Sequence, residues 1–389
     1  MSRLEFDFEP LNQVLDGKKI TKDDAYEVFS HSKYNSEKIF KVASNLRDIH
    51  KGKAVSFSKK AFFNIVNLCR DTCSYCTYKA EIDESKLSMM NIDDVKNLAK
   101  SAAKLRCTEA LLVTGESPEQ KYDEAAKWLR KNGFSSTGEY LAHCSELVLA
   151  EGLFPHTNAG NLNKSEMNDL KKTNVSMGLM LENSSHRLLE KGMPHHGAPS
   201  KDPKARIQIL KNAGELKIPM TTGILVGIGE NEHEVIDSLF TIKTLHEQFG
   251  NIQEVILQNF EPKQDTKMKD HQSTPQQYFK RIVAMARIIL PEMNIQIPPN
   301  LSPTNYDDFL DVGINDWGGI SPITVDYVNP EFAWPQINTL EKKCTEQGFE
   351  LKARFPMYPK FIKMINPNLK EKIEKLSDDE NYVRREFWR

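Results

Sequence analysis

The chain has 389 residues, with 52 lysines and arginines against 54 aspartates and glutamates, so its formal net charge is −2. Hydrophobic residues make up 39% and charged residues 27%, which excludes a wholly disordered chain, and the near-neutral balance argues against a general nucleic-acid binder. No apolar run approaches the roughly 18 residues that span a bilayer, and the acidic start lacks the apolar core of a secretory signal. We therefore expect a cytoplasmic protein that binds neither nucleic acid nor membrane.

The order of apolar runs predicts strands that alternate with helices after a helical start. Residues 1–50 are typical of short helices. Farther along, Asn231 with Glu234 three residues later is typical of a helix start. From about residue 60, short apolar runs alternate with amphipathic stretches, which indicates repeated strand–helix units in a parallel sheet. The eight expected strands cover Phe62–Val66, Ala110–Val113, Leu153–His156, Val175–Leu181, Met220–Val226, Glu254–Gln258, Asn294–Ile297 and, more weakly, Gly313–Asp316.

Eight strands without a linker favour one (β/α)8 barrel of the TIM type, and an open doubly wound sheet is the alternative. Nearly every expected strand is followed by polar or glycine-rich residues. This pattern favours the barrel, because barrel active sites lie at the carboxyl ends of the strands. We expect a helical extension over residues 1–55, the barrel over 56–360 and a charge-rich helical tail over 361–389.

The six cysteines are too few for a disulfide scaffold, and three of them lie close together. Cys69, Cys73 and Cys76 have the spacing C-x3-C-x2-C, whereas the other three are isolated and are most simply core residues. Three thiolates suit three irons of a 4Fe–4S cluster and leave the fourth iron free to bind a substrate or cofactor. A zinc knuckle usually needs a second cysteine pair, which the chain lacks; a Cys3His zinc site with a distant histidine stays open.

The run Cys69-Arg-Asp-Thr-Cys73-Ser-Tyr75-Cys76, directly after the first expected barrel strand, resembles the cysteine motif of the radical S-adenosylmethionine superfamily. In that superfamily the open iron binds S-adenosylmethionine, and one electron from the cluster cleaves it to methionine and a 5′-deoxyadenosyl radical. The resemblance implies that the three cysteines hold the cluster and that Tyr75 lies against the adenine.

Further stretches resemble elements of this superfamily in the same order along the chain. Gly115-Glu116 resembles the element that receives the methionine amino group, although alone it would be an ordinary strand-to-helix turn. Glu182 matches a polar contact to the ribose or methionine, and its simpler interpretation is a solvated loop acid. The glycine-rich segment from Gly223 to Glu230 resembles a fifth strand whose backbone flanks the adenine. Together the resemblance implies S-adenosylmethionine contacts at Tyr75, Gly115, Glu116, Asn158, Glu182, Gly223, Leu225, Gly227 and Glu230.

A closer resemblance extends from about Ser56 to Pro359. It rests on several stretches that are similar to the 7,8-didemethyl-8-hydroxy-5-deazariboflavin synthase family, and in particular to its ring-closing subunit. These stretches are Asn67–Asp71, Met180–Asn183, Lys191–His196, Gln258–Phe260 with Pro262-Lys263, Pro298–Pro303 and Gly313–Pro322. The resemblance implies a substrate made from a ribityl-diaminouracil and the 4-hydroxybenzyl part of tyrosine, ring closure with release of ammonia, and a deazaflavin product that is the precursor of coenzyme F420. It also implies a sister radical subunit as functional partner and a low-potential electron donor such as ferredoxin or flavodoxin.

Several polar residues near the expected strand ends suit such a substrate. A uracil edge needs hydrogen-bond donors and acceptors together, and the candidates for contacting the substrate are Gln258, Asn259, Asn300, Asn315 and Trp317. Proton transfer near neutral pH suits histidine, so the candidates for catalysis are His156, His195, His196 and Asp316. Each has a simpler interpretation: a loop histidine is more often solvated, and a tryptophan more often packs in a core.

Two functional alternatives stay open at this point. One is another radical enzyme from the group of the sister subunit, aminofutalosine synthase and biotin synthase, which the cysteine motif alone does not distinguish. The other is a non-catalytic iron–sulfur or zinc protein that uses the three cysteines structurally.

Overall fold

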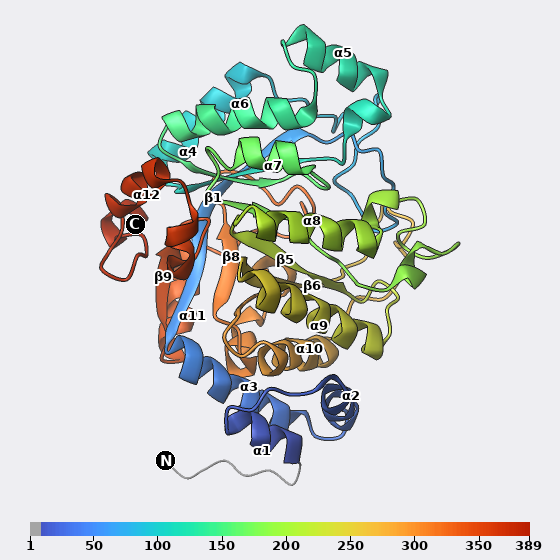
Figure 1. Ribbon diagram of the computed structural model, residues 1–389, viewed down its shortest axis with the longest axis vertical. Helices are drawn as coiled ribbons and strands as arrows, with labels where there is room; N and C mark the ends of the chain where they lie inside the picture. Colours follow the sequence, from blue (N-terminus) through green and yellow to red (C-terminus); the bar gives the residue numbers. More distant parts are fainter. Residues whose placement is uncertain (1–8) are drawn as a thin grey trace.

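The computed structural model describes residues 9–389, which form a closed parallel barrel with an added strand (Figure 1). The strand order is β2-β3-β4-β5-β6-β7-β8-β1-β9, and β2 also pairs with β1, which closes eight strands into the expected (β/α)8 barrel. The strands are β1 (Ala54–Val66), β2 (Glu109–Thr114), β3 (Phe154–Asn158), β4 (Ser176–Gly178), β5 (Met220–Val226), β6 (Ile252–Asn259), β7 (Asn294–Gln296), β8 (Asp316–Ile320) and β9 (Glu350–Arg354).

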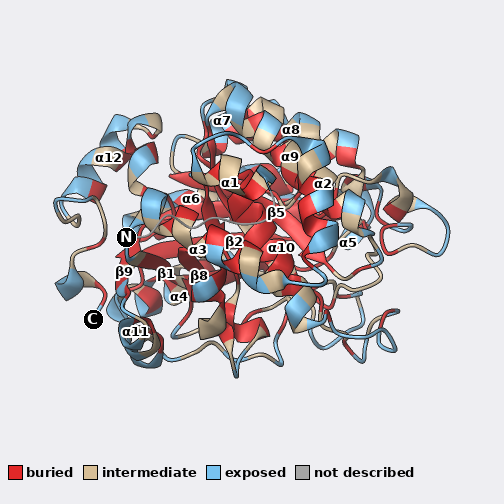
Figure 2. Cartoon of the chain, turned by 90° about the horizontal axis from the view of Figure 1, so that it is seen from below, coloured by how far each residue is buried: buried red, intermediate tan, exposed pale blue. Residues whose placement is uncertain are grey.

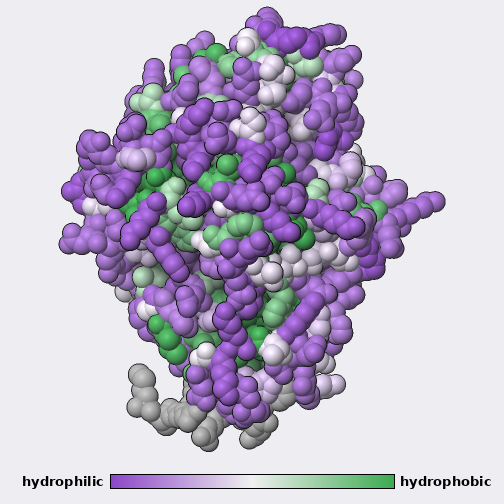
Figure 3. All heavy atoms as spheres, in the orientation of Figure 1, coloured by the Kyte–Doolittle hydropathy of each residue, from purple (hydrophilic) through white to green (hydrophobic). Residues whose placement is uncertain are grey.

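Helices surround the strands, and Figure 2 shows buried strands inside a shell whose helices expose their outer faces. Asn231 begins α9 with a reciprocal capping box to Glu234, as expected from the sequence. The helices between and after the barrel strands are α4 (Ile92–Lys104), α5 (Asp123–Lys131), α6 (Thr137–Ala150), α7 (Lys164–Leu170), α8 (Pro203–Glu215), α9 (Glu232–Phe249), α10 (Gln276–Ile289), α11 (Ile337–Glu346) and α12 (Pro367–Glu374). No described helix is long and apolar enough to cross a membrane. The face in Figure 3 is mostly hydrophilic, as this burial pattern requires.

Strand β1 is much longer than the expected Phe62–Val66. Its second half pairs with β2, from Lys60 opposite Glu109 onward, whereas its first half pairs with β9, from Ala54 opposite Glu350. The sequence did not predict β9, because the charged Glu350 and Lys352 break its apolar pattern. An edge strand tolerates charged side chains on its outward face, so the structure accommodates them there.

The expected strand at Gly313–Asp316 is wrong in position, because β8 begins only at Asp316. The glycines of β8 made its strand pattern hard to recognise in the sequence. Gly318 has φ +70°, and a Cβ there would stand 2.2 Å from Nε2 of Gln296 on the neighbouring strand, so this strand interior requires a residue without a side chain. The consequence is that Asn315 and Asp316 lie at the amino end of the strand, opposite to the rim where they were expected.

The two ends of the chain pack against the barrel. Helix α1 (Glu9–Leu15) contacts α2 (Lys22–His31) and α3 (Ser36–Lys51); α2 also contacts α9 and α10, and α3 contacts α10, at the lower end in Figure 1. Near the other terminus, Trp388 is 4% exposed and packs edge-on against Phe57 of β1. Both terminal regions therefore contribute buried residues to the fold.

Candidate active site

A pocket of about 260 Å³ lies at the carboxyl ends of the strands, where barrel sites form. All three cysteines of the motif line it from the loop after β1. Of the other residues predicted to contact cofactor or substrate, those that line the same pocket are Tyr75, Gly115, Glu116, Asn158, Glu182, Leu225, Gln258 and Asn259. Segments far apart in the sequence thus converge here, which a structural cysteine knuckle would not require.

Backbone hydrogen bonds hold the cysteine loop in place. Three of its N–H groups donate to the carbonyls of Glu116, Gly197 and Pro194, at 3.0, 2.7 and 2.9 Å. Gly115 lies so close to this loop that an added Cβ would stand 2.0 Å from the carbonyl oxygen of Leu68. Only glycine permits this close approach. The glycine of the Gly-Glu element is therefore required for packing, whether or not the element binds the cofactor. These contacts fix the position of the cysteine loop against the end of β2 and the segment after β4.

The thiols fit a cluster better than a single metal ion. Among residues 9–389, no three His, Cys, Asp or Glu side chains are placed to share one ion. A 4Fe–4S cluster makes a different demand, because each thiolate binds its own iron. The Cys69 sulfur also accepts a hydrogen bond from the backbone N–H of Glu116 at 3.2 Å, a contact of the kind that tunes cluster potential. Burial raises the pKa of Cys69 to about 11 and that of Cys73 to about 12, so iron binding must displace their protons.

Glu182 is a buried carboxylate held in an unusual backbone conformation at the pocket wall. Its φ is +63°, and its Oε1 accepts from the Lys201 ammonium at 2.5 Å. Burial alone would raise its pKa, but Lys201 and Arg206 outweigh that effect and lower it. Glu182 is therefore ionised at neutral pH, as a carboxylate that accepts from a hydroxyl or an ammonium must be.

Glu116 is the second acid of the pocket and is 6% exposed. One of its oxygens accepts from the backbone N–H of Asn161 at 3.0 Å, and the other lies 3.8 Å from the Arg70 guanidinium. Asn158, at the end of β3, is half-buried beside it in the same pocket. The pocket thus carries fixed acceptors on one side of the cysteines.

Tyr75 reaches into the pocket, and its hydroxyl lies 3.0 Å from Nε2 of His195. His195 is 2% exposed and stands behind Tyr75. Burial first, and then the positive charge of Lys201, lower the pKa of His195 to about 3, so the ring is neutral at physiological pH. His196, by contrast, is exposed, and its Nδ1 lies 3.3 Å from the Leu189 carbonyl oxygen. The structure therefore brings one of these two neighbouring histidines to the site.

The glycine-rich fifth strand contributes less than expected. Leu225 lines the pocket, but Gly223 faces β6, where an added Cβ would stand 2.0 Å from the Ile256 carbonyl oxygen. The Glu230 carboxylate accepts from the backbone N–H groups of Gly227 and Ile228 at 2.6 and 2.9 Å. It therefore caps its own loop, and neither Glu230, Gly223 nor Gly227 lines the pocket.

Five other candidates lie away from the pocket, in the interior or at the opposite end of the barrel. Trp317 is fully buried and donates from its indole to the Cys344 sulfur at 3.3 Å. Asp316 is fully buried in an ion pair with Arg354 at 2.7 Å. The remaining three are His156, bonded to Ser176, Asn300, bonded to Asp326, and Asn315, bonded to Arg287. Asn315, Asp316 and Trp317 were expected on the rim because the eighth strand was predicted a few residues too early in the sequence.

Several pocket residues were not among those predicted to contact cofactor or substrate. Lys201 and Arg206 come from the segment before and within α8, and Lys263 follows β6, where its amine donates to Asn329 Oδ1 at 2.6 Å. They are isolated basic residues in polar stretches, which only the fold brings together. Some buried polar atoms of the pocket have no partner among the described residues, namely Asp71 Oδ1, Thr114 Oγ1 and Asn259 Oδ1. Orphaned groups of this kind fit a polar ligand.

Comparisons with known proteins agree with this geometry. Residues 63–242 match the model of the Radical SAM superfamily. The fold is similar to FeFe-hydrogenase maturase HydG from Carboxydothermus hydrogenoformans, with a TM-score of 0.72 over 94% of this chain and 87% of that chain at 19% identity. It is also similar to methylornithine synthase, with a TM-score of 0.68 over 88% of this chain and 96% of that chain at 18% identity. The protein is therefore a radical S-adenosylmethionine enzyme, with a 4Fe–4S cluster and S-adenosylmethionine as cofactors.

Comparison with curated relatives identifies the family within this class of enzymes. The chain is 44% identical over 333 residues to 7,8-didemethyl-8-hydroxy-5-deazariboflavin synthase from Methanopyrus kandleri, covering 85% of this chain and all of that protein. It is 41% identical to the same enzyme from Methanocaldococcus jannaschii, covering 84% and 90%. It also matches FO synthase from Nocardia farcinica at 40% identity, over 92% of this chain but 43% of that longer protein. The chain belongs to the 7,8-didemethyl-8-hydroxy-5-deazariboflavin synthase family.

Proposed function

We propose that this enzyme closes the deazaflavin ring of the tyrosine–ribityldiaminouracil adduct in the pocket at the carboxyl ends of its strands. The observation that carries the proposal is the convergence of Cys69, Cys73 and Cys76 with the ionised Glu182 on one pocket, in a chain closely similar to named deazaflavin synthases. When bound and reduced, the cluster and S-adenosylmethionine supply the 5′-deoxyadenosyl radical that abstracts hydrogen from the substrate. Ring closure then releases ammonia.

The chain's own residues would hold the cofactors as follows. The three cysteines each bind one iron, which leaves one iron for the amino and carboxylate groups of S-adenosylmethionine. Glu116 and Glu182 are fixed acceptors for the ammonium and hydroxyl groups of that molecule. Tyr75 is held in place by neutral His195 and forms the wall against which the adenine packs.

The substrate would occupy the side of the pocket formed by β6 and the segment after β8. Gln258 offers a donor and an acceptor, and the buried Asn259 Oδ1 has no partner, so it is free to accept from a uracil N–H. Lys263 and Asn329 lie on the same wall and bond to each other, which presents a positive charge toward carbonyl oxygens of the substrate. His195 serves as the nearest neutral imidazole, one hydrogen bond behind Tyr75.

We further propose that a sister radical subunit makes the adduct and that ferredoxin or flavodoxin supplies the electron. The match covers 43% of the Nocardia farcinica FO synthase, so that protein extends well beyond the matched region. A separate partner would provide the corresponding step. A reducing cytoplasm suits three free thiols that must bind iron rather than form disulfides, and we propose that location.

Anaerobic reconstitution tests the proposal. The reconstituted enzyme, given reductant, S-adenosylmethionine and the adduct, is expected to form a fluorescent deazaflavin together with 5′-deoxyadenosine. A structural iron–sulfur protein would show a reduced-cluster EPR spectrum that does not change when S-adenosylmethionine is added. An altered spectrum without deazaflavin formation would support the radical chemistry but contradict the proposed substrate. The protein would then be another enzyme of this superfamily.

A further inference from the structure

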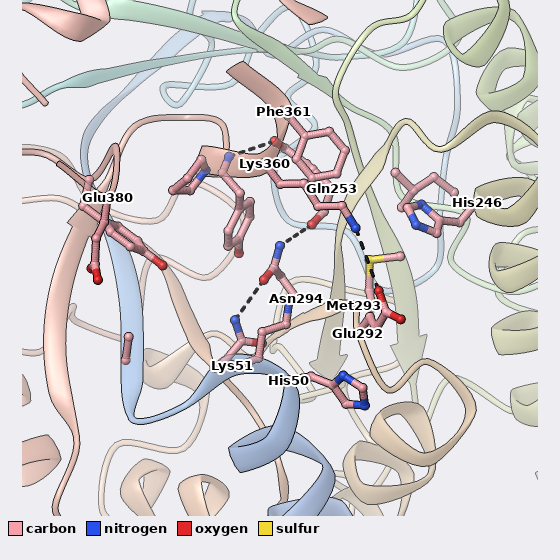
Figure 4. A pocket seen from close by; sticks show the side chains of 16 residues that line it. His50, Lys51, His246, Gln253, Glu292, Met293, Asn294, Lys360, Phe361 and Glu380 are labelled. Atoms are coloured by element: carbon pink, nitrogen blue, oxygen red, sulfur yellow. Dashed lines mark hydrogen bonds and ion pairs between the residues drawn. The ribbon is translucent and has the colours of Figure 1, made fainter. Parts of the chain in front are cut away.

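A second cavity, of about 430 Å³, lies at the opposite end of the barrel from the cysteines (Figure 4). Its wall includes the end of α3 with His50 and Lys51, the end of α9 with His246, the amino ends of β6 to β8, and residues 358–382 near the carboxyl terminus. Figure 4 shows Asn294 and Gln253 on its wall, where the Asn294 amide donates to the Gln253 carbonyl at 2.7 Å. The proposed radical chemistry uses none of these residues.

Two cations at this cavity have no counter-ion. Within residues 9–389, no hydrogen bond or ion pair holds the Lys51 ammonium, although it lines the cavity. Arg287 lies behind the wall, is fully buried and donates only to neutral acceptors, which are the carbonyls of Gly313, Pro291 and Met293 and the Asn315 amide oxygen, at 2.6 to 2.9 Å. A buried charge without an opposite charge is costly to the fold.

The carboxylates of the cavity compensate these charges only in part, because Glu292 raises the pKa of Lys51 less than burial and the neighbouring cations lower it. Glu292 is exposed and lies 3.9 Å from Lys360, while Glu380 pairs with Lys352. Burial, and then the positive charges of Arg287 and Lys360, lower the pKa of Lys51 to about 7. Burial, and then Arg47, lower the pKa of Arg287 to about 9. The surroundings thus disfavour both positive charges, and an anion in the cavity would reverse that effect.

A histidine adds a second unsatisfied group. His246 of α9 lines the cavity, and its Nδ1 is buried without a partner among the described residues. His50 lies on the same wall beside Lys51, in the last turn of α3. A ligand with several acceptor oxygens would satisfy Lys51 and His246 together.

We propose that this cavity binds a small oxyanion, a phosphate or a carboxylate, through Lys51 and His246, with Arg287 and Lys360 providing the surrounding positive field. The ligand would join the N-terminal helices, the barrel and the C-terminal segment, because each of them contributes to the wall. It would therefore stabilise the packing of both chain ends on the barrel, separately from the radical site.

Isothermal titration of the reconstituted protein with inorganic phosphate and with citrate tests the proposal, against sodium chloride at matched ionic strength. At least one of the two anions is expected to bind saturably to the wild type and to raise its melting temperature. Binding of only one of them shows whether the cavity prefers a phosphate or a carboxylate. Lys51→Met is expected to weaken that binding by about ten- to a hundredfold, the usual contribution of a charged hydrogen bond. Lys51→Arg, which keeps the charge, should retain most of it.

The exposed Lys127 of α5 offers a matched control, and Lys127→Met should bind like the wild type. Equal binding by Lys51→Met and Lys127→Met would overturn the proposal, as would a wild type that responds only to ionic strength. Circular dichroism checks that the variants are folded. Because the readouts are binding and melting temperature, their outcome is independent of whether the enzyme forms a deazaflavin.

Discussion

Replacing Glu182 with Gln separates a ligand-binding role from a purely structural one. Glu182 and Lys201 form an ion pair of 2.5 Å, with side-chain exposures of 10% and 15%. The substitution removes the carboxylate charge and leaves the Lys201 ammonium buried beside Arg206. Removal of one partner from a buried pair usually costs about 3–5 kcal/mol of folding free energy. A loss of stability is therefore expected in either case, and by itself it decides nothing about the ligand.

The affinity for S-adenosylmethionine decides the question. A hydrogen bond from an ammonium or hydroxyl to a carboxylate contributes about 1.5–3 kcal/mol, which corresponds to an increase in Kd of about ten- to a hundredfold. The assay is equilibrium binding of S-adenosylmethionine to anaerobically reconstituted protein, with the iron content of each variant measured first. The double variant Glu182→Gln/Lys201→Met removes both charges, so it should recover much of the stability but bind the cofactor as weakly as Glu182→Gln.

A matched control comes from Glu234, whose carboxylate pairs with Arg187 at 2.6 Å outside the pocket. Glu234→Gln is expected to lower stability and leave the Kd of S-adenosylmethionine unchanged. If Glu182→Gln binds the cofactor as tightly as the wild type, Glu182 only orients Lys201 and its assignment as a cofactor contact is wrong. Recovery of full affinity in the double variant would lead to the same conclusion.

Three further predictions concern the cluster, the neutral histidine and the barrel interior. Cys73→Ala should abolish the iron–sulfur absorption and 5′-deoxyadenosine formation, whereas Cys107→Ala, at a buried position outside the pocket, should keep both; turnover by the first variant would reject Cys73 as a ligand. His195 has a pKa of about 3 in the fold and about 6.5 when unfolded, so its contribution to stability is lost as pH falls from 6.5 to 3. His195→Gln should lower the slope of unfolding free energy against pH in that window by up to about 1.4 kcal/mol per pH unit, and an unchanged slope would contradict the neutral imidazole. Arg354→Met leaves two buried carboxylates without their cation and should cost about 3–5 kcal/mol in urea unfolding; a loss below about 1 kcal/mol would mean that a proton already neutralises them.

The class of fold and the cluster site could be predicted from the sequence because both rest on local patterns. Each of the first seven expected strands overlaps an observed one, since a buried parallel strand is a short apolar run. The cysteine loop needs only three thiols within one turn-rich segment, so its spacing is visible without a fold. The Gly115-Glu116 element was also identifiable, because it follows β2 directly.

The errors and omissions arose where a residue's role depends on distant contacts. Trp317 was expected on the rim, but it lies in the core against Cys344 and Tyr306, because β8 begins at Asp316 and contains two glycines. Lys201 was missed because its importance comes from Glu182, nineteen residues earlier, and their contact depends on how the loop after β4 folds back. No local pattern records either fact.

The polar groups at the two ends of the barrel show what a sequence cannot distinguish. Asp316 and Asn259 are both polar residues beside a predicted strand, and both were expected to serve the active site. In the structure Asp316 accepts from Arg354 and Ser56 and is fully satisfied, whereas Asn259 Oδ1 is buried in the pocket and accepts nothing. Because a buried polar atom without a partner costs about 1–3 kcal/mol, such atoms persist where a ligand satisfies them. The same reasoning applies to His246 at the opposite end, where its buried Nδ1 lines a cavity without a partner among the described residues. The state of their hydrogen-bond partners, rather than polar residue type, therefore distinguishes Asn259 in the pocket from Asp316 in the barrel interior.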